Sequence, residues 1–432
     1  MNVYEKANER IAYTFKHFDN VYVSFSGGKD SGVMLNLVID YMRKNEITKK
    51  IGVFHIDYEA QYQMTTEYVD KVLSENLDIL DIYRVCLPIA AHCATSMYQD
   101  HWIPWEKEKK DIWVRPLPEN SINEENHKFG FFKNGMRDYD LQVKFSEWLH
   151  KEKKATRTAC LVGIRTQESF NRWRAIHSDK RTELYKGIQW TTKMFDNVYN
   201  IYPIYDWVTE DVWTANAKFN WSYNHLYDLY WQAGLTIDKM RVSSPFHDWA
   251  TESLKLYRAI EPHTWGKMVG RVNGVNFTGL YGGTTAMGWR KIKLPKGHTW
   301  KSYMEFLLKT LPEESAINYK KKLEISQNFW RTNGGCLSDN VVRKLKKKGV
   351  AITDGKENKR KTRKKPVCME YLDDIDITEF KDIPTYKRMC ICIMKNDHLC
   401  KYMGFSLNKT EIFLRQEAES KYKNVTSKIK IK

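Results

Sequence analysis

The first 250 residues alternate between short apolar runs and longer amphipathic stretches, which predicts strands separated by helices. The expected elements are, in chain order, a helix over 5–18, a strand over 21–25, a helix over 33–42, a strand over 51–56, a helix over 65–78 and a strand over 82–87. Strands that alternate with helices build parallel sheets covered on both faces. The predicted fold class is therefore α/β, with a parallel sheet at its centre.

A second group of α/β signals follows a break in the pattern. Residues 98–150 include several tryptophans among lysines and prolines, so we interpret them as an insertion outside the sheet. Residues 159–164 then predict a strand that enters a helix, 198–204 a further strand and 210–217 a helix. The α/β pattern thus continues to residue 245.

The remainder of the chain is mainly helical by pattern, with glycine-rich interruptions between Gly274 and Gly283. We predict four parts: an α/β domain over 1–245, a helical region over 246–342, a basic linker over 343–366, and a small C-terminal module with a basic tail over 367–432.

The chain is strongly basic, with 70 Lys and Arg against 53 Asp and Glu among 432 residues, a formal charge of +17. Such a charge favours a polyanionic partner, either nucleotide phosphates or nucleic acid, and does not separate the two. Residues 343–365 alone carry twelve basic and two acidic side chains. This tract is either a solvated linker or a contact for nucleic acid in the C-terminal half.

Several classes of protein are excluded by the sequence. No run approaches the roughly 18 apolar residues of a membrane helix, and the first residues lack the apolar core of a signal peptide. The 8 cysteines are spread along a long chain, unlike those of a disulfide-rich secreted domain. We expect a cytoplasmic protein without a membrane partner.

The segment 26–31 has the composition of a phosphate-binding loop. It reads Ser26, Gly27, Gly28, Lys29, Asp30 and Ser31, directly after a predicted strand and before a predicted helix. Glycines let backbone N–H groups approach an anion, and the helix N-terminus adds a positive dipole. A tight turn without ligand is the alternative, since the spacing is neither that of the Walker A loop nor that of the dinucleotide-binding fingerprint.

This loop resembles the SGGxDS pattern of the PP-loop superfamily. The resemblance implies that the loop grips the phosphates of a nucleotide, whose α-phosphorus is the electrophile. Further segments resemble the phosphoadenosine-phosphosulfate (PAPS) reductase-like branch. One of them is the branch's D-T-G…T segment, which places Asp57 at the end of the second strand and Thr65 eight residues later. Tyr58 and Glu59 stand where the branch has Thr and Gly. The resemblance places Asp57 and Thr65 on the adenosine side; a helix N-cap is the alternative for Asp57.

Two later segments extend the similarity. Residues 162–172 resemble the branch's element with two arginines. The resemblance implies that Arg165 and Arg172 bind phosphate or sulfate oxygens, that Glu168 orients one of them, and that Gly163 belongs to the nucleotide site. The alternative is a solvated helix with salt bridges. The segments 203–213 and 223–228 resemble further elements of the branch. They are mostly structural by composition, although Asp206 is a candidate contact to ligand or metal.

The wider chain resembles the immunoglobulin-binding regulator A-like subtype, whose relatives are often encoded in mobile elements beside a ParB-like protein. A ParB-like partner is therefore a hypothesis from resemblance alone. We find no C-terminal nucleophilic cysteine segment of the kind that true PAPS reductases carry, so conventional sulfonate reduction is not expected. Three cysteines and a histidine near the C-terminus form a C-x-C, H-x-C pattern: Cys390, Cys392, His398 and Cys400, with Cys368 upstream. We interpret these as packing residues and expect neither zinc nor an iron–sulfur cluster.

The expected ligand is ATP or PAPS, with Mg²⁺. Lys29, Asp30, Arg165 and Arg172 are the predicted catalytic residues, and Asp30 either holds Mg²⁺ or caps the helix. One hypothesis is an enzyme that attacks the α-phosphate with release of pyrophosphate, or transfers sulfur, possibly to nucleic acid. The other is a nucleotide-sensing regulator or phage-defence component that binds nucleic acid.

Overall fold

The chain folds into two compact units, each described here by itself. A computed structural model describes residues 2–96, 99–168, 172, 173, 176, 183–282, 294–355, 365–395 and 397–405. The first unit comprises Met1–Thr95 with His101–Gly282, and the second Ser96–Asp100 with Gly283–Lys432. The first unit thus continues past the predicted boundary at residue 245, because the helices that follow it pack into the same core. None of the described helices combines the length and apolarity needed to cross a membrane.

The first unit follows the predicted order of strands and helices. Its elements are α1 (Val3–His17), β1 (Asn20–Ser24), α2 (Lys29–Lys44), β2 (Ile51–Ile56), α3 (Gln63–Ser74), β3 (Leu80–Cys86), β4 (Ala91–His92), β5 (His101–Trp102), β6 (Ile122–Asn123), α4 (Asp138–Glu152), β7 (Thr158–Val162), β8 (Thr191–Phe195), β9 (Val198–Ile201), α6 (Thr209–Phe219), α7 (Leu226–Gln232), α8 (Thr251–Ile260), α9 (Pro262–Arg271) and α10 (Val275–Tyr281).

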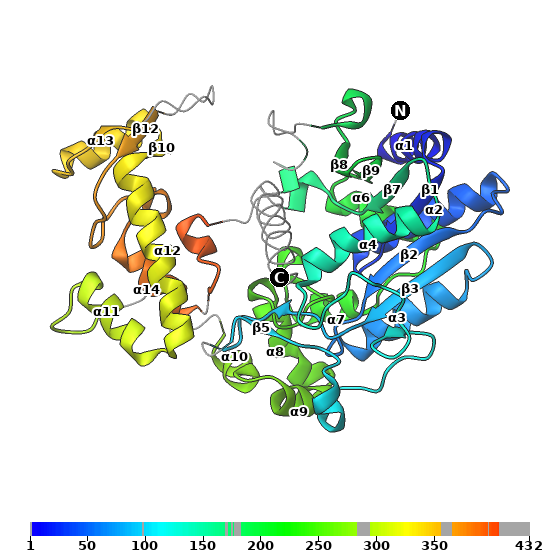
Figure 1. Ribbon diagram of the computed structural model, residues 1–432, viewed down its shortest axis with the longest axis horizontal. Coiled ribbons are helices and arrows are strands. Elements are labelled where there is room, and N and C mark those ends of the chain that lie inside the picture. The colour runs from blue at the N-terminus through cyan, green and yellow to red at the C-terminus, as the bar shows by residue number, and fades with distance from the viewer. Residues whose placement is uncertain are drawn as a thin grey trace, which may run out of the picture. The chain divides into compact units, whose positions relative to one another are not determined.

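Seven strands form the central sheet, in the order β6-β3-β2-β1-β7-β9-β8. All neighbours are parallel except β8 and β9, which pair antiparallel at one edge. The central strand β1 pairs with β2 on one side, Val23 opposite Val53, and with β7 on the other, Val23 opposite Leu161. The expected α/β class with a mostly parallel sheet is confirmed, and the antiparallel edge strand β8 is an addition to it (Figure 1).

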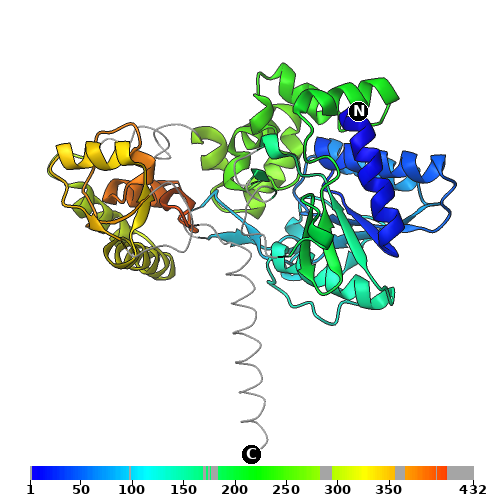
Figure 2. The same ribbon diagram turned by 90° about the horizontal axis from the view of Figure 1, so that it is seen from above.

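Successive strand residues point to opposite faces, which gives the sheet a core on each side. Val21 and Val23 pack in the cluster formed with α1, α2, α3 and α6. Tyr22, between them, packs in the other cluster with α4, α7 and the helices α8, α9 and α10. Because both faces are covered, the strands read as nearly continuous apolar runs rather than as alternating ones. The helices flanking the sheet can be followed in Figure 1 and Figure 2.

The segment 98–150 differs from the prediction. We expected an insertion outside the sheet, yet Ile122–Asn123 adds the parallel edge strand β6 beside β3. Helix α4 covers one face of the sheet, where Phe145 stacks on Phe54 with ring centroids 4.1 Å apart. A two-residue strand carries too little hydrophobic pattern to be recognised, and its pairing is set by the neighbouring strand.

The second unit is helical with a small sheet. Its described elements are α11 (Trp300–Thr310), α12 (Glu313–Thr332), β10 (Gly335–Leu337), α13 (Asp339–Lys347), β11 (Thr353–Asp354), β12 (Lys365–Cys368) and α14 (Tyr386–Met394). The mainly helical C-terminal region is confirmed, and the antiparallel sheet β10-β12-β11 was not predicted.

The predicted basic linker over 343–366 is largely built into this unit where it is described. Helix α13 buries Val341 and Leu345, and Lys344 pairs with Glu379 at 2.7 Å. Regular apolar spacing within the lysine-rich sequence explains why a helix forms there. Residues 356–364 of the tract, and the basic tail beyond 405, lie outside the described residues.

Asp206 belongs to an ion pair that ties α1 to the segment after β9. Arg10 donates from Nη1 and Nη2 to the two carboxylate oxygens of Asp206, both at 2.7 Å, and from Nη1 to the carbonyl of Pro203. The two side chains are 10% and 24% exposed. Both carboxylate oxygens are thus paired within the fold, and a contact of Asp206 to ligand or metal stays a prediction.

We predict that Asp206→Asn lowers the free energy of unfolding by about 2–3 kcal/mol, because it leaves a largely buried guanidinium without its counter-charge. Arg43 and Asp78 form a matched control, a bidentate pair whose side chains are 48% and 58% exposed. Asp78→Asn should cause a much smaller change, since exposed pairs are screened by water. Urea unfolding followed by circular dichroism measures both; equal losses would contradict the assignment.

Candidate functional site

The predicted phosphate loop links β1 to the start of α2. Gly27 has φ +75°, a left-handed conformation that favours glycine, and Gly28 is the N-cap of α2. No side chain caps the helix through Gly28, although the Tyr227 hydroxyl accepts a hydrogen bond from the Lys29 N–H at 3.1 Å. The first N–H groups of a helix have no intrahelical acceptor. The loop therefore directs backbone donors and the positive end of the helix dipole at one point.

Serine hydroxyls hold the loop in shape. Ser31 Oγ accepts a hydrogen bond from the Ser26 N–H at 3.2 Å and lies 3.0 Å from Ser26 Oγ. Asn224 donates from Nδ2 to the carbonyl of Gly27 at 3.2 Å and to Thr65 Oγ1 at 2.9 Å. Thr65 is fully buried and packs beneath Gly27. Thr65 therefore supports the loop from below.

Two close backbone approaches require glycine. A Cβ on Gly27 would lie 2.9 Å from the Val69 side chain. A Cβ on Gly163, at the end of β7, would lie 2.6 Å from the carbonyl oxygen of Asp30. Gly163 thus lets the end of β7 pack directly against the first turn of α2, and its role toward a nucleotide stays a prediction.

A buried ion cluster forms where these segments meet. Asp30 accepts hydrogen bonds from Lys29 Nζ at 2.7 Å and from Arg165 Nε at 2.6 Å. All three residues are at most 9% exposed. Burial alone would raise the pKa of Asp30, but Lys29 and Arg165 outweigh it and hold the pKa below its ordinary value. Burial lowers the pKa of Lys29, although the Asp30 carboxylate opposes this shift.

This cluster does not suit a magnesium site at Asp30. One carboxylate oxygen of Asp30 faces Lys29 and the other faces Arg165. A hard divalent cation needs oxygen ligands that are not already neutralised by two cations. The residues present therefore fit an anion in place of Mg²⁺.

Further basic side chains lie close to the same cluster. Arg172 pairs with Glu168 and interacts electrostatically with Asp30, Arg165 and Arg241. Glu168 also accepts from the Arg165 N–H at 3.3 Å. Four cations thus face two carboxylates, a formal charge of +2 that favours an anionic ligand.

Arg241 was missed by sequence reasoning. It lies outside every matched motif, in the segment after α7, and its Nε is buried without a hydrogen-bond partner among the described residues. Tyr227, at the loop, was noted only as part of an aromatic layer. The signal available for Arg241 was a basic side chain in a stretch of mixed polar and apolar residues, which by itself indicates no site.

Asp57 lies under the surface. It is fully buried and accepts hydrogen bonds from Arg84 Nε at 3.1 Å and from the Glu59 N–H at 3.0 Å, and it also pairs with Arg115. Burial would raise its pKa, but the two arginines and His55 hold the pKa well below the ordinary value. Both carboxylate oxygens of Asp57 are thus paired within the fold, and its place on the adenosine side of a nucleotide stays a prediction.

Glu59 accepts the hydrogen bonds of a second buried ion pair. In the sequence, this residue stands out only as a departure from the family pattern. It has φ +64° and accepts from Arg271 Nε at 2.9 Å and from the N–H groups of Trp105 and Val114. This pairing connects the end of β2 to helix α9.

A cavity of about 430 Å³ lies on the outer side of this region. Three cations and an aromatic ring are among the residues that line it: Lys110, Trp113, Arg115, Pro116, Leu117 and Lys267. Arg115 links the cavity to Asp57. An anionic group with a flat apolar part is the chemistry that such a lining accommodates.

Four cysteines of the second unit, Cys368, Cys390, Cys392 and Cys400, are buried, and Cys336 is partly exposed. Cys390 and Cys392 lie on α14, and the Cys392 thiol donates to Asp397 Oδ2 at 3.5 Å. Burial raises the pKa of both thiols. Cys368 belongs to β12, and His398 approaches the carbonyl of Ser96 with its Nε2 at 3.3 Å.

Comparison with known proteins agrees with this fold. Residues 20–234 match the phosphoadenosine phosphosulfate reductase domain, and residues 234–413 match a domain of unknown function, DUF3440. The first unit is thus a PP-loop, PAPS reductase-like domain. The chain is 34% identical over 427 residues to the uncharacterized protein YbdN of Escherichia coli (strain K12), covering 98% of this chain and 95% of that protein. The chain belongs to the family of that protein.

Solved structures resemble part of the chain. They include the PAPS reductase of Candida auris, 18% identical with a TM-score of 0.29 over 52% of this chain and 84% of that one. The U34-tRNA thiolase NcsA of Methanococcus maripaludis is 14% identical with a TM-score of 0.30 over 63% and 79%. The FMN adenylyltransferase of Candida glabrata with FAD and pyrophosphate is 13% identical with a TM-score of 0.31 over 52% and 59%.

We predict that Gly163→Ala destabilises the first unit by about 1–3 kcal/mol, because its Cβ would meet the backbone of Asp30. Gly130→Ala is the control, since a Cβ there meets nothing within 4 Å. Thermal melting of both variants measures the difference. An unchanged melting temperature for Gly163→Ala would show that β7 and α2 do not approach this closely.

His55 should make the first unit sensitive to acid. It is fully buried on β2, with Nδ1 2.9 Å from the carbonyl of Phe25, and burial lowers its pKa from 6.5 to about 4. Because the pKa is lower in the folded state, the unfolded chain binds more protons below the ordinary pKa. Stability is complete above pH 6.5 and is lost as the pH falls toward 4.

We predict that His55→Gln reduces the loss of unfolding free energy between about pH 7 and pH 4.5 by about 2–3 kcal/mol, from 1.36 kcal/mol per pKa unit. Urea unfolding at several pH values measures this slope. His225→Gln is the control, because His225 is 65% exposed and pairs with Asp228 at the surface. A slope unchanged by His55→Gln would contradict the assignment.

Proposed function

We propose that the first unit binds an adenine nucleotide, with its phosphates against the 26–31 loop, and cleaves it at the α-phosphate with release of pyrophosphate. The observation that carries this proposal is the glycine loop at the start of α2. Its N-cap is Gly28, which has no side chain to cap the helix, and the described charged side chains around the loop sum to a formal charge of +2. The match to a PAPS reductase domain supports the choice of ligand.

In this proposal each group of the site has a role. Backbone N–H groups after Gly28 and the helix dipole would hold phosphate oxygens. Arg165 and Lys29 are fixed by Asp30, so their donors are preorganised and need no reorientation when charge develops. Asp30 is therefore a positioning residue. Arg172 and Arg241 would stabilise the leaving pyrophosphate.

The reaction is an in-line displacement at phosphorus. The electron pair of an acceptor oxygen, nitrogen or sulfur forms the new bond to the α-phosphorus, and the bond from that phosphorus to the bridging oxygen breaks. Pyrophosphate leaves with the electron pair of the broken bond, and a proton on the acceptor passes to solvent. Placement and charge stabilisation are the main contributions that such a transfer requires of a protein.

The cysteines of the first unit argue against a thiol-dependent reduction. Its three cysteines, Cys86, Cys93 and Cys160, are all buried. Burial raises the pKa of Cys86 well above the ordinary value, so that thiol stays protonated. A nucleophilic thiolate needs exposure and a lowered pKa. Chemistry at phosphorus therefore fits this unit better than reduction of a sulfonate by its own thiol.

We predict that ATP or PAPS raises the melting temperature of the protein, because a ligand that binds only the folded state stabilises it. Lys29→Met should remove most of this increase, since Lys29 is a buried cation at the loop. Lys44→Met is the matched control: the same charge is removed from the exposed last turn of the same helix. Arg241→Gln should weaken binding about tenfold or more and leave the Lys29–Asp30 pair in place.

Assay of pyrophosphate release with ATP, and of sulfate release with PAPS, whose α-phosphate is joined to a sulfate group, then tests the reaction. Nucleotide-dependent release that is lost in Lys29→Met and kept in Lys44→Met is the expected result. Nucleotide binding without any release, together with binding to nucleic acid, would favour the regulator hypothesis instead. Equal melting shifts in Lys29→Met and the unchanged protein would exclude the loop as the site.

A further inference from the structure

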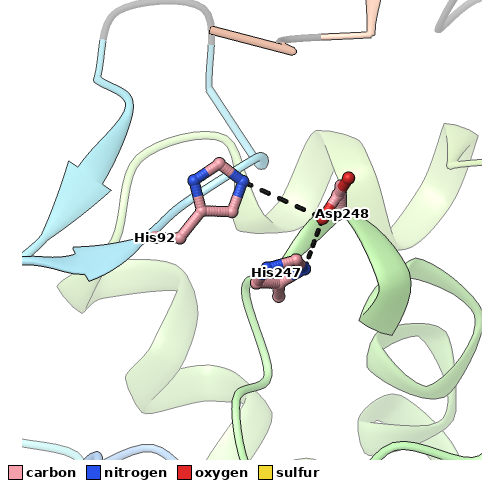
Figure 3. Close-up of side chains that lie close together, drawn as sticks. All are labelled: His92, His247 and Asp248. Atoms are coloured by element: carbon pink, nitrogen blue, oxygen red, sulfur yellow. Dashed lines mark ion pairs between the residues drawn. The ribbon is translucent and has the colours of Figure 1, made fainter. Parts of the chain in front are cut away.

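Two imidazoles and one carboxylate gather on the first unit, and none of them belongs to the phosphate loop or its basic cluster. His92 lies on β4, and His247 and Asp248 form the turn into the short helix Asp248–Ala250. His92 Nε2 lies 3.9 Å from Asp248 Oδ1, and His247 Nδ1 contacts the same oxygen. Figure 3 shows both rings directed at the Asp248 carboxylate.

The fold holds these residues from two sides. The Ala94 N–H donates to the carbonyl of Phe246 at 2.8 Å, which fixes the strand segment of His92 beside the residue before His247. Trp102, opposite Ala91 in the β4–β5 ladder, packs edge-on against Phe246 with ring centroids 4.8 Å apart. The three side chains therefore meet because two segments about 150 residues apart in sequence are packed together.

A hydrogen bond orients His247, and all three side chains are partly exposed to solvent. His247 Nδ1 accepts a long hydrogen bond of 3.3 Å from the Trp249 N–H, which keeps this edge of the ring toward Asp248. The side chains of His92, His247 and Asp248 are 17%, 27% and 31% exposed. A small cation can reach them without opening the core, and in binding it would replace this long hydrogen bond.

The donor set and its spacing suit a transition-metal cation. One donor atom from each residue lies within 4.8 Å of the other two, and among the described residues this is the one group of three His, Cys, Asp or Glu with that property. Zn²⁺ bonds to imidazole nitrogen and carboxylate oxygen at about 2.0–2.2 Å, which places tetrahedral ligands roughly 3.3 Å apart. The separation of His92 Nε2 and Asp248 Oδ1, 3.9 Å, exceeds that value by about 0.6 Å.

We propose that His92, His247 and Asp248 bind one borderline divalent cation such as Zn²⁺. Two imidazoles select such an ion over Mg²⁺, which prefers oxygen ligands alone. Three protein ligands leave a coordination position open to water or a small anion, as in sites where the metal takes part in chemistry. This site is independent of the nucleotide loop, and either can exist without the other.

The test is calorimetric titration of ZnCl₂ into the full chain, with any affinity tag removed and metals stripped by a chelator. Near neutral pH, where histidines are mostly uncharged, we expect one tight equivalent of Zn²⁺ per chain. His92→Ala, His247→Ala and Asp248→Asn should each weaken this equivalent at least about tenfold. Co²⁺ as a second probe should give visible absorption bands that disappear in the same variants.

His225→Ala is the matched control, because His225 Nδ1 lies 2.9 Å from Asp228 but has no second imidazole in the group. It should bind Zn²⁺ as the unchanged chain does. Asp248→Asn keeps the side-chain shape, so it tests the site even if an alanine variant loses its fold, which circular dichroism without metal would reveal. Zn²⁺ binding that is absent, or that is unchanged in Asp248→Asn, would overturn the proposal.

Discussion

The bond that the rest of the first unit depends on is the pairing of Asp30 with Lys29 and Arg165 at the junction of β1, α2 and β7. Three ionised groups are almost fully buried there, a costly arrangement unless each charge is compensated. Their mutual contacts provide that compensation, and Gly163 permits it by letting the end of β7 approach the first turn of α2. The same contacts fix the donors that an anion would meet, so stability and the proposed binding share one set of atoms.

A second network of buried ion pairs compensates charges at the end of β2. Asp57 is compensated by Arg84 and Arg115, and Glu59 by Arg271. These pairs tie strand β2 to helix α9 and to the segment that precedes β6. Burying carboxylates in this way gives no direct contact to a ligand, but it rigidifies the sheet edge that faces the loop. Arg84 also pairs with Asp70, and Arg115 reaches the surface in the cavity that Lys110 and Lys267 also line.

The strands of the sheet could be predicted because local pattern and tertiary environment agree there. Runs such as 21–25 and 51–56 are apolar on both faces, as strands between two helical layers must be. The strands β6 and β8 could not be predicted, since β6 has only two residues and β8, with the sequence TTKMF, is more polar than the other strands of that sheet. The tract 343–366 was misjudged because its lysines dominate the composition while Val341 and Leu345 provide the buried face.

The sequence by itself determined the α/β order, the glycine loop at the start of α2 and the grouping of Lys29, Asp30 and Arg165 in one site, because these depend on local turn chemistry and motif spacing. Only the tertiary structure decided which charges face a ligand. Asp57 and Asp206 form ion pairs with arginines from other elements. Arg241 lies near the basic cluster, and His92 lies near His247 and Asp248. Basic side chains from distant segments can pair with the same carboxylate. Spacing along the chain does not predict which of these ion pairs forms in the fold.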